Sequence, residues 1–86
     1  MRRSRLQMTE RETAPIARHF FAHHVRRLRH ERGWSQLQLA EAAGIHRTHV
    51  SRLENSVFNA SIDTVDDIAG AFGVRACTLL ESPAAG

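Results

Sequence analysis

Residues 36–55 read QLQLAEAAGIHRTHVSRLEN, and this stretch decides the fold. Its apolar side chains recur at helical spacing in two short runs, which Gly44 separates. A glycine suits a tight turn between two helices because it adopts a positive φ without steric cost. Ala40 is small enough to let the two helices cross closely. The stretch therefore predicts a helix-turn-helix whose second helix covers residues 46–54.

The second motif helix has two chemically different sides. Val50 and Leu53 face inward, so the polar side chains opposite them project outward, namely Arg47, Thr48, Ser51 and Arg52. An α-helix fits the major groove of B-DNA, and the residues near its N-terminus reach the base edges. Arg47 can donate two hydrogen bonds to a guanine, and Thr48 can offer a hydroxyl or a methyl group. This pattern indicates a DNA-reading helix.

Helical periodicity continues on both sides of the motif. Residues 16–32 predict a first helix, Ser35 is a candidate N-cap for the helix after it, and Ser61 is the corresponding candidate for a fourth helix. A short last helix is predicted over residues 76–81. Because no segment alternates as a strand would, we predict an all-α fold with about five helices.

The two ends of the chain lack this periodicity. Residues 1–15 are polar and Pro15 closes them, so we expect a flexible basic arm. Residues 82–86 are expected to form a flexible tail. One DNA-binding domain over residues 16–81 remains, which agrees with a length of 86 residues.

Charge is distributed unevenly along the sequence. The net charge is +3, but residues 1–52 carry +7 and residues 53–86 carry −4, and all the basic residues are arginines. A basic half suits a polyanionic partner. Ordinary solvated surface arginines would give the same composition, so charge alone leaves both interpretations open.

Several classes of protein fit the sequence poorly. No apolar run approaches the ~20 residues of a membrane span, and no secretory signal is recognisable. Cys77 is the only cysteine, so we expect a cytoplasmic protein without an internal disulfide. No nucleophile triad, glycine-rich phosphate loop or paired-carboxylate pocket is present, and we expect no enzymatic activity.

Six histidines raise the question of a metal site. His19 and His23 are four residues apart, and His46 and His49 are three apart, so each pair can share one helix face. Neither pair has a nearby cysteine or carboxylate to complete a tetrahedral set, and we expect no metal and no cofactor. We expect His46 and His49 at the DNA face instead, where protonation would add positive charge.

Residues 24–81 resemble the Cro/repressor-type helix-turn-helix family, also called the XRE family. The matching text is VRRLRHERGWSQ at residues 25–36, Leu39-Ala40, Gly44-Ile45, VSRLEN at residues 50–55, Ile68-Ala69 and FGV at residues 72–74. The combined pattern covers about two-thirds of the chain and is specific, although no single piece of it is. The resemblance implies the compact five-helix bundle of lambda-repressor-like DNA-binding domains.

The resemblance also implies roles for individual residues. Gln36 matches a position that contacts phosphate and supports the recognition helix, and Asn55 begins a segment whose backbone amides touch phosphate. Arg29 and Glu54 match a pair that forms a structural salt bridge. Base or phosphate contacts are implied for Arg47, Thr48, Ser51 and Arg52.

The chain departs from the family pattern just after the motif. Ser56 stands where glycine is common, and Val57 and Phe58 stand where basic or polar residues are common. The loop after the recognition helix is therefore less cationic than usual, which weakens the case for strong phosphate contacts there.

Taken together, the sequence predicts a sequence-specific transcriptional regulator, more specifically a repressor, whose partner is a double-stranded DNA operator. We expect a homodimer, with Leu79 and Leu80 as candidate contacts, because paired modules gain affinity on pseudo-palindromic sites. The alternative is a protein–protein interaction module that keeps the fold without reading DNA. The apolar Val57 and Phe58 and the acidic C-terminal half motivate that alternative.

Overall fold

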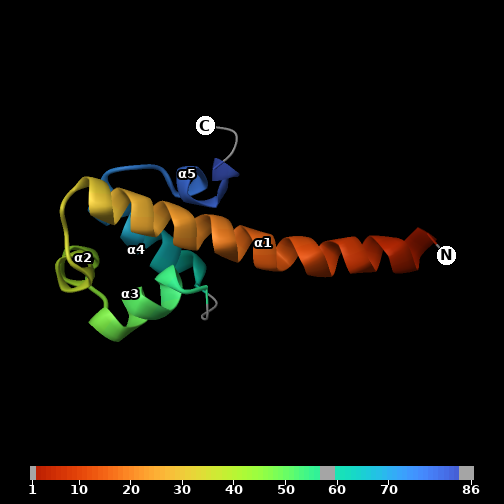
Figure 1. The fold of residues 1–86 in the computed structure, drawn as a ribbon, viewed down its shortest axis with the longest axis horizontal. Helices are drawn as coiled ribbons and strands as arrows, with labels where there is room; N and C mark the ends of the chain where they lie inside the picture. Colours follow the sequence, from red (N-terminus) through yellow and green to blue (C-terminus); the bar gives the residue numbers. More distant parts are fainter. Residues whose placement is uncertain (1, 57–59, 84–86) are drawn as a thin grey trace.

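The computed structural model describes residues 2–56 and 60–83, with only the backbone for residues 2–15. These residues form five helices and no strand: α1 (Arg2–Glu31), α2 (Gln36–Ala43), α3 (Arg47–Glu54), α4 (Ile62–Phe72) and α5 (Ala76–Leu80). In Figure 1, α1 runs the length of the molecule, with α5 on one side of it and α2 and α3 on the other. The predicted all-α, five-helix architecture is confirmed.

Local capping residues explain where the short helices begin and end. Ser35 forms a capping box at the start of α2, since its Oγ accepts from Gln38 N at 3.0 Å and its own N donates to Gln38 Oε1 at 2.7 Å. Ser61 caps α4 through Thr64 N. Gly44 ends α2 in the left-handed region at φ 74°, as the turn requires.

One apolar core joins all five helices. Its buried members are Phe21, Val25, Leu28, Leu39, Ala40, Val50, Leu53, Val65, Ile68, Ala69, Phe72 and Leu79. Leu79 has an exposed fraction of 0%, so the expectation that it contacts a second copy is wrong. Its neighbour Leu80 is 40% exposed, because successive helical residues point about 100° apart.

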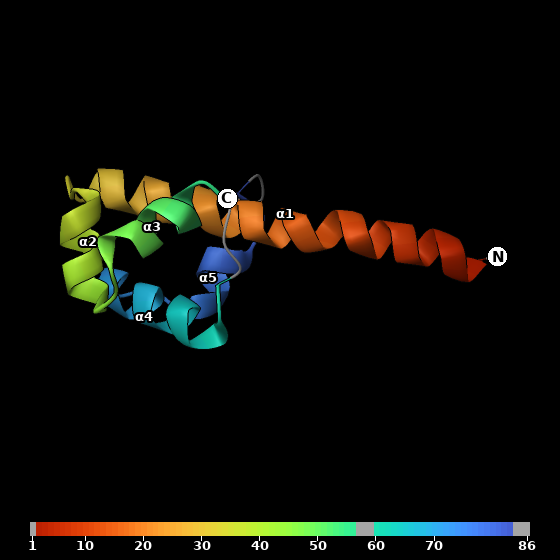
Figure 2. The same cartoon turned by 90° about the horizontal axis from the view of Figure 1, so that it is seen from below.

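The first helix is longer than the sequence predicts. The backbone of residues 2–15, expected as an unstructured arm, continues α1 away from the helical bundle (Figure 2). Helix-favouring arginine, glutamine, leucine, methionine and glutamate are frequent in this segment, which explains the difference. Pro15 lies inside the helix although it removes one backbone donor. The placement of the domain over residues 16–81 stays a prediction.

The turn between α1 and α2 is anchored on α4 by aromatic packing. The rings of Trp34 and Phe72 stack with centroids 5.7 Å apart and an interplanar angle of 17°. The Arg32 guanidinium lies 5.7 Å from the Trp34 centroid and donates to the Phe72 carbonyl at 2.5 Å. These contacts fix the beginning of α2 relative to the core.

Candidate nucleic-acid interface

The third helix turns one side to the core and the other to solvent. Val50, Leu53 and Glu54 are buried, and α3 packs against α1 and α2. On its opposite side, Arg47, Thr48 and Arg52 are exposed and Ser51 is half-buried. The structure therefore brings these four predicted contact residues together on one surface, here called the α3 outer surface.

His46 lies beside the α3 outer surface and has a local structural task. Its Nδ1 accepts a hydrogen bond from Thr48 N at 3.1 Å, which makes His46 the N-cap of α3. The ring is exposed. A protonated imidazole has no acceptor nitrogen, so this cap exists only with the neutral ring. Sequence reasoning placed His46 at the interface but did not identify this capping contact.

His49 does not lie on the α3 outer surface. Its ring is half-buried, and its Nε2 atom is buried within the protein. On a helix, His49 is about 200° from Arg47 and lies on the same side as Leu53, because each residue advances 100°. The structure therefore places His49 away from the four residues of the α3 outer surface, whereas His46 is exposed beside them.

Glu54 connects α3 to α1 and α2 through a buried polar network. Arg29 donates from Nε to Glu54 Oε2 at 2.5 Å and from Nη2 to Oε1 at 3.0 Å. The side chains are 12% exposed for Arg29 and 3% for Glu54. Gln36 Nε2 donates to Oε1 at 3.2 Å. This is the ion pair that the family resemblance implies, and Gln36 joins it.

Arg26 adds a contact that sequence reasoning missed. Its Nη1 donates to the backbone carbonyl of Glu54 at the C-terminal end of α3, where a positive charge complements the helix dipole. The only available signal was its spacing, since Arg26 precedes Arg29 by one helical turn. Together, Arg26 and Arg29 hold both the side chain and the backbone of Glu54.

The segment after α3 begins with Asn55 and Ser56. Asn55 is the exposed C-cap residue, and its Nδ2 donates to the Ser51 carbonyl at 2.9 Å. Ser56 has a φ of 59°, the left-handed conformation that favours glycine, which explains why the family pattern prefers glycine here. Its Oγ lies 3.1 Å from His19 Nδ1. Val57 and Phe58 lie outside the described residues.

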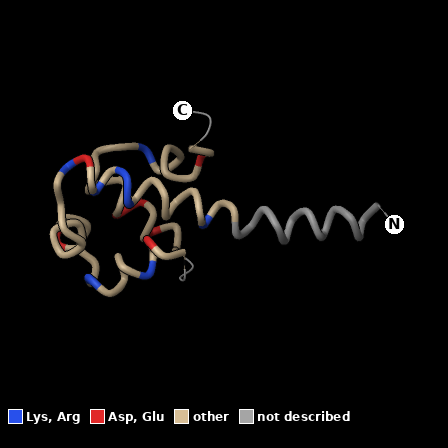
Figure 3. The backbone as a smooth tube through the Cα atoms, in the orientation of Figure 1, with Lys and Arg blue, Asp and Glu red and all other residues tan. Residues whose placement is uncertain are grey.

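The charges around the α3 outer surface favour an anionic partner. Neither α2 nor α3 has an acidic residue in its first turn, and the only carboxylate of α3 belongs to the buried Glu54. Basic positions occur on both α1 and α3 (Figure 3). The surface therefore combines two exposed guanidinium groups, Arg47 and Arg52, with the positive end of the α3 dipole.

Two features are absent from the described part of the chain. Among residues 2–56 and 60–83, no helix is both long and apolar enough to span a membrane. Within those same residues, no three or more His, Cys, Asp or Glu side chains gather as a metal site would require.

Known proteins resemble this chain in sequence and in fold. It is 39% identical over 62 residues to a hypothetical transcription factor of Neisseria meningitidis, covering 72% of this chain and 58% of that protein. It is 32% identical over 56 residues to the immunity repressor protein of Bacillus phage phi105, covering 65% and 39%. It is 36% identical over 62 residues to the control protein C.BamHI of Bacillus amyloliquefaciens, covering 71% and 76%. The chain thus spans less than two-thirds of the first two relatives.

A solved structure and a family model agree with these relatives. The crystal structure of the Neisseria transcription factor matches with a TM-score of 0.76 at 37% identity, covering 79% of this chain and 78% of that one. The helix-turn-helix family model matches residues 25–79, which include the motif, the ion-paired Arg29 and Glu54, and buried core residues from all five helices. This chain belongs to the Cro/repressor-type (XRE) helix-turn-helix family.

Proposed function

We propose that the protein is a sequence-specific DNA-binding transcriptional regulator that acts as a repressor. The observation that carries this proposal is the α3 outer surface, on which Arg47, Thr48, Ser51 and Arg52 lie together. The buried ion pair between Glu54 and Arg29 holds this helix against α1. The names of the relatives, which include a transcription factor and an immunity repressor, support regulation over the interaction-module alternative. A repressor that acts by occupying its operator requires no catalytic residues. Bacterial and phage DNA lies in the cytoplasm, and we place the protein there.

Each residue of the α3 outer surface has a proposed task. Arg47, in the first turn of α3, donates to the O6 and N7 of a guanine, and Thr48 meets the neighbouring base. Ser51 and Arg52 lie one turn later and contact bases or phosphates. Asn55 and the exposed His46 sit at the two ends of α3, where the DNA backbone passes.

Gln36 takes a double role in this proposal. It is the first residue of α2 and is half-buried, with its amide bound to Glu54. Its position at the N-terminus of α2 suits a phosphate contact, while the bond to Glu54 links that contact to α3. Binding energy at the phosphate is thereby coupled to the position of the reading helix.

The test of DNA binding is a salt titration. Affinity for a fragment of the gene's upstream region and for random-sequence DNA is measured by calorimetry from low to high salt. We expect log K to fall linearly with log salt, with a slope of about −0.9 for each phosphate neutralised, and the upstream fragment to bind more tightly. A flat response, or equal affinity for both DNAs, would contradict the proposal.

We also propose that two copies pair through the face formed by α5 and the beginning of α4. Leu80 is 40% exposed there and Ile62 is 79% exposed, while Cys77 is exposed on the same short helix. These two helices are in contact. A second copy is the proposed occupant because one helix-turn-helix buries limited surface on DNA and a symmetric pair reads two half-sites.

A further inference from the structure

A hollow of about 380 Å³ lies between α1 and the chain at and after α5. Its walls include His23, His24 and Arg27 of α1, and Thr78 and Glu81 at the other side. This volume is at the lower end of the ~300–1,000 Å³ that small-molecule sites occupy, so it suits one small ligand. In Figure 1, α5 and α3 lie on opposite sides of α1.

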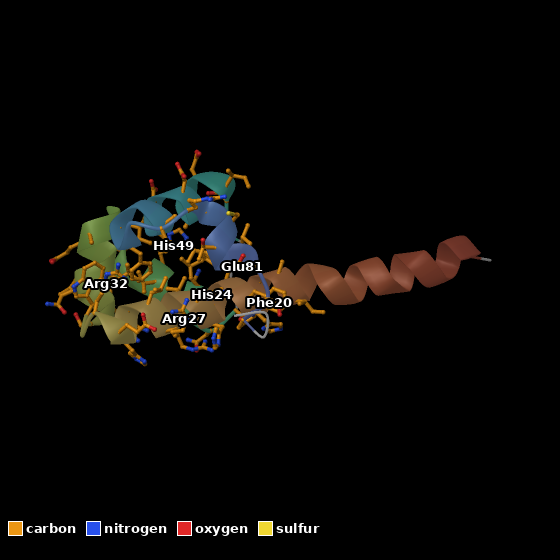
Figure 4. All side chains as sticks on the ribbon, turned by 90° about the horizontal axis from the view of Figure 1, so that it is seen from above. Phe20, His24, Arg27, Arg32, His49 and Glu81 are labelled. Carbon is orange, nitrogen blue, oxygen red and sulfur yellow. The ribbon has the colours of Figure 1, made fainter. Side chains whose placement is uncertain are left out.

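A buried imidazole holds the two walls together. His24 is 5% exposed, and its Nε2 donates to the Glu81 carbonyl at 3.0 Å. Its Nδ1 accepts from Arg27 Nη2 at 3.1 Å; both residues are labelled in Figure 4. A guanidinium can only donate, so His24 is the neutral tautomer that carries its proton on Nε2. The position of Arg27 is thereby tied to the segment that follows α5.

Arg27 is the cation of the hollow, and its guanidinium retains N–H groups that can donate to a ligand. Its Nη1 donates to Glu31 Oε2 at 3.0 Å, which, with the His24 contact, engages two N–H groups. A guanidinium has five N–H donors, so capacity remains for another acceptor. The side chain is 38% exposed and therefore reachable from solvent.

We propose that this hollow binds a small organic monoanion, with its carboxylate against the Arg27 guanidinium. The planar fork of arginine matches a carboxylate in geometry and strengthens both hydrogen bonds by charge. Thr78 offers a hydroxyl from the facing wall, and His23 offers an exposed ring. Glu81 is also a lining residue, and the negative charge of its side chain disfavours ligands with more than one charge, such as phosphate esters.

Occupancy of this site would act on the C-terminal part of the molecule. A ligand between Arg27 and Thr78 bridges α1 and α5, and α5 carries the exposed Leu80 of the proposed pairing face. The consequence for pairing rests on the proposed homodimer, whereas the binding site itself does not.

The test uses the full chain and benzoate as the probe, with benzamide as its neutral counterpart at constant ionic strength. Amide resonances are followed by NMR during titration. We expect saturable shifts for benzoate at the amides of residues 23–27 and 78–82, and an apparent affinity at least tenfold lower for benzamide, because a charge-assisted contact is lost.

Variants separate this site from general attraction of anions to arginines. We expect Arg27→Gln to weaken benzoate binding about tenfold or more, and Thr78→Val to weaken it by a smaller factor. Glu31→Gln removes the same surface ion pair as Arg27→Gln but keeps the guanidinium, so it should retain binding. Benzoate shifts that fail to saturate, that spread over the exposed arginines, or that persist unchanged in Arg27→Gln would overturn the proposal. Arg27→Lys, which keeps the charge without the fork, checks the result if Arg27→Gln unfolds.

Discussion

Glu54 illustrates how one residue serves the interface without touching DNA. Its carboxylate is almost fully buried, and three donors from Arg29 and Gln36 satisfy it. Removing one member of a buried pair leaves the other charge uncompensated, which is more damaging than losing an exposed pair. The chain also contains an exposed pair, Arg27 and Glu31, against which the difference can be measured.

We predict that Glu54→Ala lowers the free energy of unfolding by about 3–5 kcal/mol. Glu31→Ala, the matched control in an exposed pair, should lower it by only about 0.2–1 kcal/mol. Urea denaturation followed by circular dichroism measures both values. Losses of similar size in the two variants would show that burial of the Arg29–Glu54 pair does not govern its contribution.

Arg47 is the residue on which the proposed reading of DNA depends most. We predict that Arg47→Ala weakens operator binding by about 1–3 kcal/mol and relaxes specificity at one base pair. Because Arg47 is exposed, the fold should be unchanged. Affinities for a set of single-base operator variants provide the measurement, and an equal loss on every sequence would reassign Arg47 to a phosphate contact.

Residue-level prediction from the sequence works where a side chain lies near the middle of a helix face. Arg47, Val50 and Leu53 lie where the periodicity places them. His49 lies at the edge of the inward face, and small rotations that only the packed structure fixes decide its exposure. Sequence reasoning missed the Arg26 contact because it depends on how α1 crosses the end of α3.

Among the elements, the turn between α2 and α3 has a specific backbone requirement. Gly44 has a φ of 74°, whereas Gly70 lies within helical α4. At both positions an added Cβ would have no heavy atom within 4 Å, apart from its chain neighbours and the backbone of its own helix. Backbone conformation alone therefore distinguishes the two glycines.

We predict opposite effects for alanine at these two glycines. Gly44→Ala should destabilise the protein by about 1–2 kcal/mol, because an L-residue is strained in the left-handed region. Gly70→Ala should stabilise it by about 0.5–1 kcal/mol, because alanine loses less backbone entropy in a helix. Thermal unfolding of the two variants measures the difference, and a change of the same sign in both would refute the conformational explanation.

Helix boundaries could be predicted closely where a cap marks them. Ser35, Ser61 and Gly44 all cap or end helices as the sequence suggests. The boundary at Pro15 was wrong for the backbone, because proline disfavours but does not forbid a helix interior. The helix-favouring residues before residue 16 extend the helix past this point.

At the scale of the whole molecule, the longest extent is 48 Å, which α1 accounts for, since 30 helical residues span about 45 Å. Among the side chains that the structure describes, those of the buried core begin at Phe21. The sequence could not predict which of Leu79 and Leu80 is exposed. The answer depends on how α5 packs against α1 and α4.

We predict that Leu80→Glu converts the proposed dimer to a monomer while the fold is retained. A buried carboxylate in the centre of a pairing face would be unpaired and desolvated. Leu37→Glu is the matched control, because Leu37 is also an exposed leucine but lies on α2. Sedimentation equilibrium gives the mass of each variant, and a dimer that survives Leu80→Glu would place the pairing face elsewhere.

The stacking of Trp34 on Phe72 gives the protein its own optical reporter. The chain has one tryptophan and no tyrosine, so its fluorescence under selective excitation comes from this single site at the turn between α1 and α2. Emission should shift to longer wavelength when α4 separates from that turn, as the indole becomes hydrated. Since Trp34 is held against α4 and not on the α3 outer surface, we expect operator binding to leave the emission wavelength nearly constant. A spectrum recorded without any label can therefore separate loss of folding from loss of DNA binding in every variant considered above.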